Sequence, residues 1–304
     1  MNLKRFVSVS VILLMSVLLV NAGRQICENY RTKKINDGLK QQKELVFDEL
    51  SQEILANVKR FPGEAGIYIK DLQTGVEFTY NESKPFPSAS LVKIPLMAAV
   101  FQSIDDGNIS LYSQVKLQRK NKSAGSGVLK RTRSGRIYSV EDLLELMITK
   151  SDNTATNMLT DQIGMDYANW VFRNKFGLQT TNFNRYIMDL GKRNSGIENY
   201  TSAKEMGEIL EKIYRGTLIN QECSSQMLAI LMKQKINDRI PRFLPHDLVV
   251  AHKTGLMQDI CHDAGIVYTP NGDFIVCVLT GEIRSLRVAK RFIGNVAFKA
   301  YQCY

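Results

Sequence analysis

The segment Phe86-Pro87-Ser88-Ala89-Ser90-Leu91-Val92-Lys93 stands where a helical pattern begins. It places the hydroxyl of Ser90 and the amine of Lys93 three residues apart, so both project from one face within about one helical turn. A serine becomes a strong nucleophile when a neighbouring base takes its proton, and a lysine is such a base when its surroundings hold it neutral. The spacing alone is weak support, because Ser113-Gln114-Val115-Lys116 repeats it without a catalytic context.

Two later motifs give the first one its meaning. Ser151-Asp152-Asn153 follows in a helical region, and Lys253-Thr254-Gly255 sits at the end of a strand predicted over residues 248–251. In this order the three motifs resemble the signature of class A β-lactamases and penicillin-binding proteins, serine hydrolases that act through an acyl-enzyme. The segments Gly125-Ser126-Gly127-Val128-Leu129 and Asn153-Thr154-Ala155-Thr156-Asn157 also look like that family. The resemblance runs over roughly residues 64–303.

The resemblance implies a role for each matching residue. Ser90 would attack the carbonyl carbon, Lys93 would accept or relay its proton, and Ser151 would pass a proton to the leaving nitrogen. The backbone N–H groups of Ser90 and Leu256 would form the oxyanion hole.

Substrate binding is implied in the same way. Asn153 would hold the side-chain amide of the substrate, and Lys253, Thr254 and Gly255 would receive its carboxylate by charge and hydroxyl. Asp152 is expected to be a helix cap that orients its loop.

One loop departs from the class A pattern. Those enzymes carry a glutamate that directs water onto the acyl-enzyme, and the best local match is Arg185-Tyr186-Ile187-Met188-Asp189-Leu190-Gly191. Ile187 falls on the glutamate position and Gly191 on a position that is asparagine in the family. An isoleucine cannot activate water. Asp189 therefore substitutes for the glutamate, or the loop is built differently, or deacylation is slow.

The order of predicted elements favours one α/β unit with an inserted all-α domain. A helix over residues 35–59 and a hairpin of residues 66–69 and 76–80 come first. Helices over 140–148, 155–163, 203–214 and 224–232 follow, then strands over 248–251, 264–268 and 274–280 and a helix over 285–301. We expect an antiparallel sheet flanked by the N- and C-terminal helices, with an α/β part over about 30–85 and 245–304 and a helical part over about 86–244. A ligand is expected in the cleft between them.

The N-terminus predicts export. Lys4 and Arg5 precede an apolar run from Phe6 to Val20, typical of a signal peptide over residues 1–22 with cleavage after Ala22, although an uncleaved anchor is the alternative. The formal charge is +10, and loss of Lys4 and Arg5 leaves +8. Much of the excess lies between residues 116 and 136, where eight basic residues occur without an acid. A solvated surface or weak contact with an anionic wall or membrane surface explains this, whereas nucleic acid fits poorly.

The remaining chemistry of the chain is limited. At 304 residues, 44% of them apolar, it can bury the core of one or two globular domains, and we expect a monomer. No cofactor or metal is expected, because His252 and His262 lack a matching carboxylate spacing. Five cysteines are an odd number. The first and last helices pack side by side in the resembled family, which implies that Cys27 and Cys303 come close enough for a disulfide.

Three functions stay open at this point. The first is opening of β-lactam rings through an acyl-enzyme on Ser90. The second is D,D-peptidase or esterase activity of the same fold on a cell-wall peptide. The third is a non-turnover penicillin-binding sensor or wall-associated protein, which the missing loop glutamate motivates.

Overall fold

The computed structural model describes residues 3–304, and the side chains of residues 21, 25 and 28–304. The first helix, α1, runs continuously over Leu3–Arg60. Contacts divide the chain into two units, residues 1–46 and residues 47–304, and the second unit carries the sheet and the other helices. All of the predicted signal peptide except residue 21, and Cys27 with its predicted pairing to Cys303, lie outside the residues whose side chains are described. Within the described part of the chain, no helix is long and apolar enough to cross a membrane.

A five-stranded antiparallel sheet forms the frame of the second unit, with strand order β2-β1-β9-β8-β7. The first and last parts of the sequence meet in this sheet, since β1 pairs with β9 in the register Ile67↔Val278. The strands are β1 (Glu64–Asp71), β2 (Glu77–Tyr80), β7 (Val250–Leu256), β8 (Cys261–Val267) and β9 (Phe274–Gly281). The predicted antiparallel sheet is thus confirmed.

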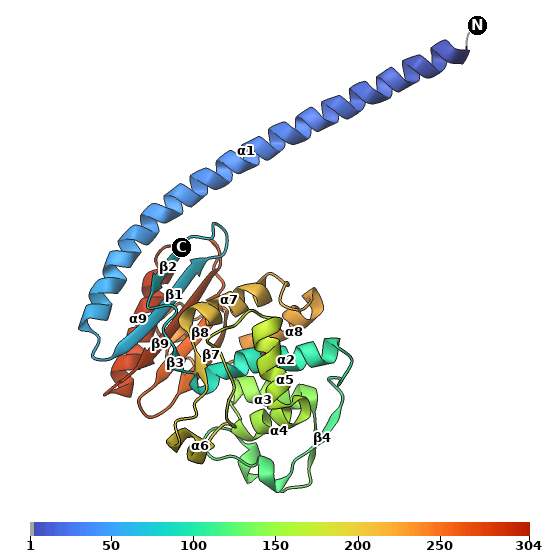
Figure 1. The fold of residues 1–304 in the computed structure, drawn as a ribbon. Coiled ribbons are helices and arrows are strands. Elements are labelled where there is room, and N and C mark those ends of the chain that lie inside the picture. Colours follow the sequence, from blue (N-terminus) through green and yellow to red (C-terminus); the bar gives the residue numbers. More distant parts are fainter. Residues whose placement is uncertain (1–2) are drawn as a thin grey trace. The chain divides into compact units, whose positions relative to one another are not determined.

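Helices lie on both faces of the sheet (Figure 1), and the buried apolar side chains form a separate core on each face. On one face, Phe47, Leu50 and Ile54 at the end of α1 pack with α9 (Leu286–Tyr301) against apolar residues of β1 and β9. The other face joins the helical part, where the buried side chains of β8 and β9 meet those of the inserted helices. Burial of apolar area on both faces, at about 25 cal/mol per Å², is the main stabilising contribution.

The inserted part is mainly helical, as predicted. Its helices are α2 (Lys93–Asp105), α3 (Val140–Thr149), α4 (Asn153–Ile163), α5 (Met165–Asn174), α6 (Leu190–Asn194), α7 (Ala203–Tyr214) and α8 (Gln221–Met232). Two small ribbons accompany them, β3 (Phe86–Pro87) with β6 (Tyr200–Thr201), and β4 (Gln114–Lys116) with β5 (Ile137–Ser139). The β3–β6 ribbon fastens the segment before Ser90 to the end of the 185–199 loop.

The strand predicted over residues 248–251 was placed too early. β7 runs over Val250–Leu256, so His252 and the Lys253-Thr254-Gly255 motif lie inside the strand. Every residue from Ala251 to Gly255 is buried, because both faces of β7 are covered. Such a strand does not alternate between polar and apolar residues. The three consecutive polar or charged residues His252, Lys253 and Thr254 therefore led to a predicted strand that ends at Ala251.

α7 packs closely against the sheet at a glycine, Gly207. A Cβ at Gly207 would stand 2.2 Å from the ring of Tyr68 on β1, a separation that real Cβ atoms do not adopt. The absence of a side chain here sets how closely the helix approaches the strand.

We predict that Gly207→Ala lowers the free energy of unfolding by about 1–3 kcal/mol, because the methyl group overpacks the contact with Tyr68. Gly38→Ala in α1 is the matched control: nothing lies within 4 Å of its Cβ position, and alanine favours a helix over glycine by up to about 1 kcal/mol. Denaturant unfolding of both variants checks this. Equal stability of Gly207→Ala and the wild type would contradict the proposed close approach.

Candidate active site

Ser90 stands on a tight turn that leads into α2. The 3₁₀ helix η1 covers Ala89–Val92, and Lys93 is the first residue of α2. Ala89 has φ +47°, a left-handed conformation that a residue with a side chain rarely adopts. Such strain persists where the surrounding contacts hold it. One of these contacts is the N–H of Ser88, which donates to the carbonyl of Asn199 at 2.7 Å.

The hydroxyl of Ser151 is the meeting point of the three motifs. It donates to Ser90 Oγ at 3.0 Å and accepts from Lys93 Nζ at 3.2 Å and from Lys253 Nζ at 3.0 Å. Ser151 has φ +49°, so its backbone too is held in an unusual conformation. One donor and two accepted bonds use the full capacity of this hydroxyl. The structure therefore brings Ser90, Lys93, Ser151 and Lys253 together, with Ser151 as the link to both lysines.

Both lysines are fully buried, which alters their acidity. Burial, followed by the charge of Lys253, holds the pKa of Lys93 well below its ordinary value. Burial also lowers the pKa of Lys253, to about 7. Removing an ammonium group from water disfavours its charged form. The lowered pKa makes Lys93 a better candidate for the base, and Lys253 is the neighbouring cation in the same network.

The Ser151-Asp152-Asn153 segment is held by its own side chains. Asp152 caps α4, accepting from the N–H of Ala155 at 2.9 Å, and its other oxygen accepts from the N–H groups of Val128 and Leu129 at 2.6 and 2.9 Å. The expected role of Asp152 as a helix cap is thus confirmed. Asn153 Oδ1 accepts from Lys93 Nζ at 2.9 Å, while Asn153 Nδ2 donates to the carbonyl of Ala124 at 2.8 Å.

A cavity opens in front of Ser90. Its lining joins the turn, the helical part, the 185–199 loop and the end of β7: Ser88, Ala89, Ser90, Gly125, Ser126, Asn153, Arg185, Ile187, Met188, Leu190, Arg193, Glu198, Asn199, Leu256, Met257 and Gln258. Ser90 and Leu256, whose N–H groups were predicted to face the substrate together, both line it. The lining does not include the buried residues Lys93, Ser151, Lys253, Thr254 and Gly255.

A family model described as the β-lactamase enzyme family matches residues 49–304. The chain belongs to this family. The β-lactamases of Streptomyces fradiae and Streptomyces albus G are 27% and 25% identical to it, over 67% and 75% of this chain and 69% and 76% of theirs. Among solved structures, a β-lactamase of Sphaerobacter thermophilus has a TM-score of 0.77 at 32% identity, covering 83% of this chain and 95% of its own.

A structure described as PBP-A is similar as well. It has a TM-score of 0.78 at 29% identity and covers 84% of this chain and 95% of its own. A variant of PBP-A with equal similarity is an acyl-enzyme complex with penicillin G. The predicted class A-like serine hydrolase fold is confirmed by these matches.

Within this β-lactamase family member, the 185–199 loop places Ile187 at the cavity and Asp189 elsewhere. The main chain of Ile187 is fixed, since its N–H donates to Asn157 Oδ1 at 3.2 Å and its carbonyl accepts from Ser123 Oγ at 3.0 Å. The carboxylate of Asp189 caps α6 by accepting from the N–H of Lys192 at 3.1 Å. Asp189 lines a neighbouring hollow and not the cavity of Ser90.

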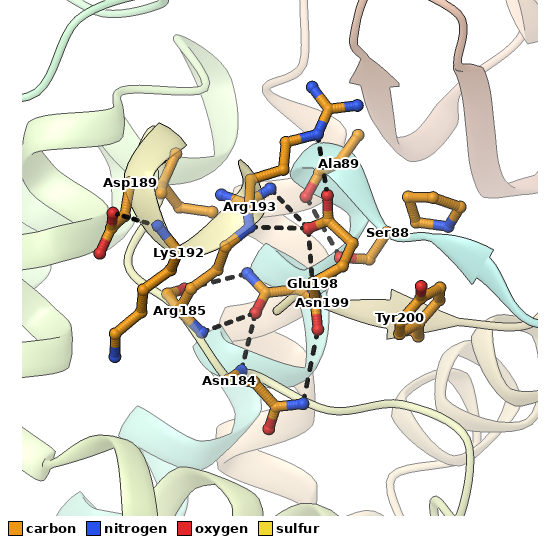
Figure 2. Close-up of polar contacts among 12 residues, drawn as sticks. Ser88, Ala89, Asn184, Arg185, Asp189, Lys192, Arg193, Glu198, Asn199 and Tyr200 are labelled. Atoms are coloured by element: carbon orange, nitrogen blue, oxygen red, sulfur yellow. Dashed lines mark hydrogen bonds and ion pairs between the residues drawn. The ribbon is translucent and has the colours of Figure 1, made fainter. Parts of the chain in front are cut away.

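Sequence reasoning missed Glu198, the carboxylate that does line the cavity. The carboxylate of Glu198 is bound by two arginines: Arg185 Nε donates to Oε1 at 2.8 Å, and Arg193 Nε stands 3.2 Å from Oε2 (Figure 2). The N–H of Asn199 donates to it as well, at 2.8 Å. Both oxygens of this carboxylate are therefore already bound by guanidinium groups. Arg185 stood in the loop pattern, but nothing in the sequence linked it to an acid thirteen residues later.

Proposed function

We propose that this protein opens β-lactam rings by forming an ester with Ser90. Ser90 Oγ attacks the lactam carbonyl carbon, the carbon–nitrogen bond of the ring breaks, and the ring nitrogen takes a proton. The proton leaves Ser90 by way of Ser151 Oγ, which lies 3.0 Å from Ser90 Oγ and 3.2 Å from Lys93 Nζ. For this transfer the hydroxyl of Ser151 turns, so that it accepts from Ser90 and donates to Lys93, whose pKa is lowered by burial. This hydrogen-bonded chain is the observation that carries the proposal.

The second half of the reaction has less support from the residues present. Hydrolysis of the ester needs a base that directs water onto it. Of the described residues that line the cavity, Glu198 alone carries a carboxylate, and two arginines hold it. Ile187 offers no acceptor in its side chain. We therefore propose that acylation is fast and deacylation slow.

Slow deacylation is also consistent with a second function. A protein that acylates and holds the adduct serves as a penicillin-binding sensor or wall-associated protein, or as a D,D-peptidase whose natural acyl donor is a cell-wall peptide. The likeness to PBP-A, whose variant is an acyl-enzyme complex with penicillin G, favours this candidate. The persistence of the adduct on Ser90 separates it from an efficient β-lactamase.

We expect mass spectrometry of the protein mixed with benzylpenicillin to show one stoichiometric adduct that is absent from Ser90→Ala. In Ile187→Glu the adduct should be released about 10-fold faster or more, because general-base catalysis contributes 10²–10⁴-fold. Ile187→Gln is the matched control, since its amide has the same reach but takes no proton. Rapid turnover by the wild type, unaltered in Ile187→Glu, would show that another group activates water.

A pH dependence follows from the pKa of Lys253, about 7. Because burial lowers this pKa, Lys253 is cationic below about pH 7 and neutral above it. We propose that its charge attracts the carboxylate of a β-lactam. The ratio of the acylation efficiencies for benzylpenicillin and for a neutral ester should fall as pH rises through about 7. Taking the ratio cancels effects on the nucleophile, and a ratio constant from pH 6 to 8.5 would contradict the role of Lys253.

We further propose an exported protein whose basic surface contacts an anionic wall or membrane surface. Of the eight basic residues between 116 and 136, six are exposed, and Lys120 pairs with Asp161 at 3.0 Å. Fractionated cells should yield protein outside the cytoplasm that begins at Gly23 and leaves the envelope fraction in high salt, since salt screens such contacts. Cytoplasmic protein that retains Met1 would contradict export, and salt-independent retention would contradict the surface contact.

A further inference from the structure

His262 on β8 is fully buried and uses both nitrogens of its ring. Nε2 lies 2.9 Å from the carbonyl of Pro87, and Nδ1 lies 3.0 Å from the N–H of Thr280 on β9. A carbonyl only accepts and an N–H only donates, so the proton is on Nε2 and the ring is neutral. Burial lowers the pKa of His262 to about 4, which agrees with a neutral ring at physiological pH.

The segment to which His262 is hydrogen-bonded, at Pro87, leads directly to the nucleophile Ser90. Pro87 lies three residues before Ser90, and between them Ala89 is held at φ +47°. The carbonyl of Pro87 is bound by His262 from the sheet side. The N–H of Ser88 donates to the carbonyl of Asn199 in the 185–199 loop, and Figure 2 labels these two residues. Two polar contacts on the single peptide group between Pro87 and Ser88 thus fix the turn on which Ser90 stands.

His262 is equally close to the other half of the predicted oxyanion hole. It pairs with Gly255 in the β7–β8 register. A Cβ at Gly255 would meet His262 Cβ at 3.2 Å and Ala89 Cβ at 3.3 Å, so these three residues pack against one another. Ser90 follows Ala89 and Leu256 follows Gly255. One side chain therefore contacts both segments that present the N–H donors.

We propose that His262 is a positioning residue that sets the separation between the Ser90 turn and the end of β7, and so aligns the two N–H groups for acylation. His262 positions the Ser90 turn through its hydrogen bond to Pro87, and its hydrogen bond to Thr280 holds the imidazole ring against the sheet. Misplacement of a reacting group by about 1 Å costs on the order of 100-fold in rate. The inference rests on the proposed acylation of Ser90.

Two substitutions separate the two bonds. The amide nitrogen of His262→Gln is as many bonds from Cβ as Nε2, so Gln retains a donor for Pro87 and loses the acceptor for Thr280. The amide oxygen of His262→Asn matches Nδ1, so Asn retains the acceptor for Thr280 and loses the donor for Pro87. An unsatisfied buried N–H costs about 1–3 kcal/mol. A purely structural role therefore predicts that Gln is no more stable, and no more active, than Asn.

The test is the acylation of Ser90 by benzylpenicillin in the wild type, His262→Gln and His262→Asn, with denaturant unfolding of each. We expect Asn to lower the acylation rate constant about 10- to 100-fold with little change in the binding constant, and Gln to stay within about threefold of the wild type although it is less stable. Acylation rates that follow stability, or equal rates in both variants, would overturn the proposal.

Failure of the proposed function is read separately. If the wild type forms no adduct with benzylpenicillin, the proposed acylation by β-lactams is wrong. The rate at which a phosphonofluoridate labels Ser90 is then measured in the wild type, His262→Gln and His262→Asn instead. The same order, wild type and Gln above Asn, supports positioning by His262, and any other order overturns it.

Discussion

The hydroxyl of Ser151 joins the nucleophile turn, the first residue of α2 and the middle of β7 by hydrogen bonds. It stabilises two buried lysines by accepting from both. Two ammonium groups in one buried site repel each other and lose hydration, so the network is stable when at least one of the lysines is neutral. The low pKa of Lys93 is the result. The same constraint that makes the site costly to bury thus provides the base that a serine nucleophile needs.

The rest of the fold serves to hold this network in place. Asp152 links α4 to the loop by accepting hydrogen bonds from the N–H groups of Val128 and Leu129. A Cβ at Gly127 would stand 2.2 Å from Asp152 Cγ, so the loop comes this close to Asp152 because residue 127 is a glycine. The turn at Ala89 is held by a hydrogen bond from His262 in the sheet and by one to Asn199 in the 185–199 loop. Positive φ values at Ala89 and Ser151, neither of which is a glycine, mark where local backbone preference gives way to these contacts.

The 185–199 loop gives the site its distinct character within the β-lactamase family. Its polar side chains bind one another and the loop's own main chain: Asn199 Oδ1 accepts from the N–H groups of Asn184 and Arg185, and Glu198 is shared by Arg185 and Arg193. These contacts hold the loop against the Ser90 turn. They also leave no uncommitted carboxylate among the described residues at the cavity, which is the basis for the proposed slow deacylation.

The sequence by itself determined the fold class, the five strands and two flanking helices in their order along the chain, and the three motifs. Helical and strand periodicity is a local property, and the motif order of Ser90, Ser151 and Lys253 resembles a known family. Only the tertiary structure decided that Ser151 links both lysines, that Asp189 faces a helix end while Glu198 faces the cavity, and that His262 bridges Pro87 and Thr280. Each of these depends on contacts between residues that are 18 to 175 positions apart or on the direction of a side chain, and neither is encoded in a local pattern.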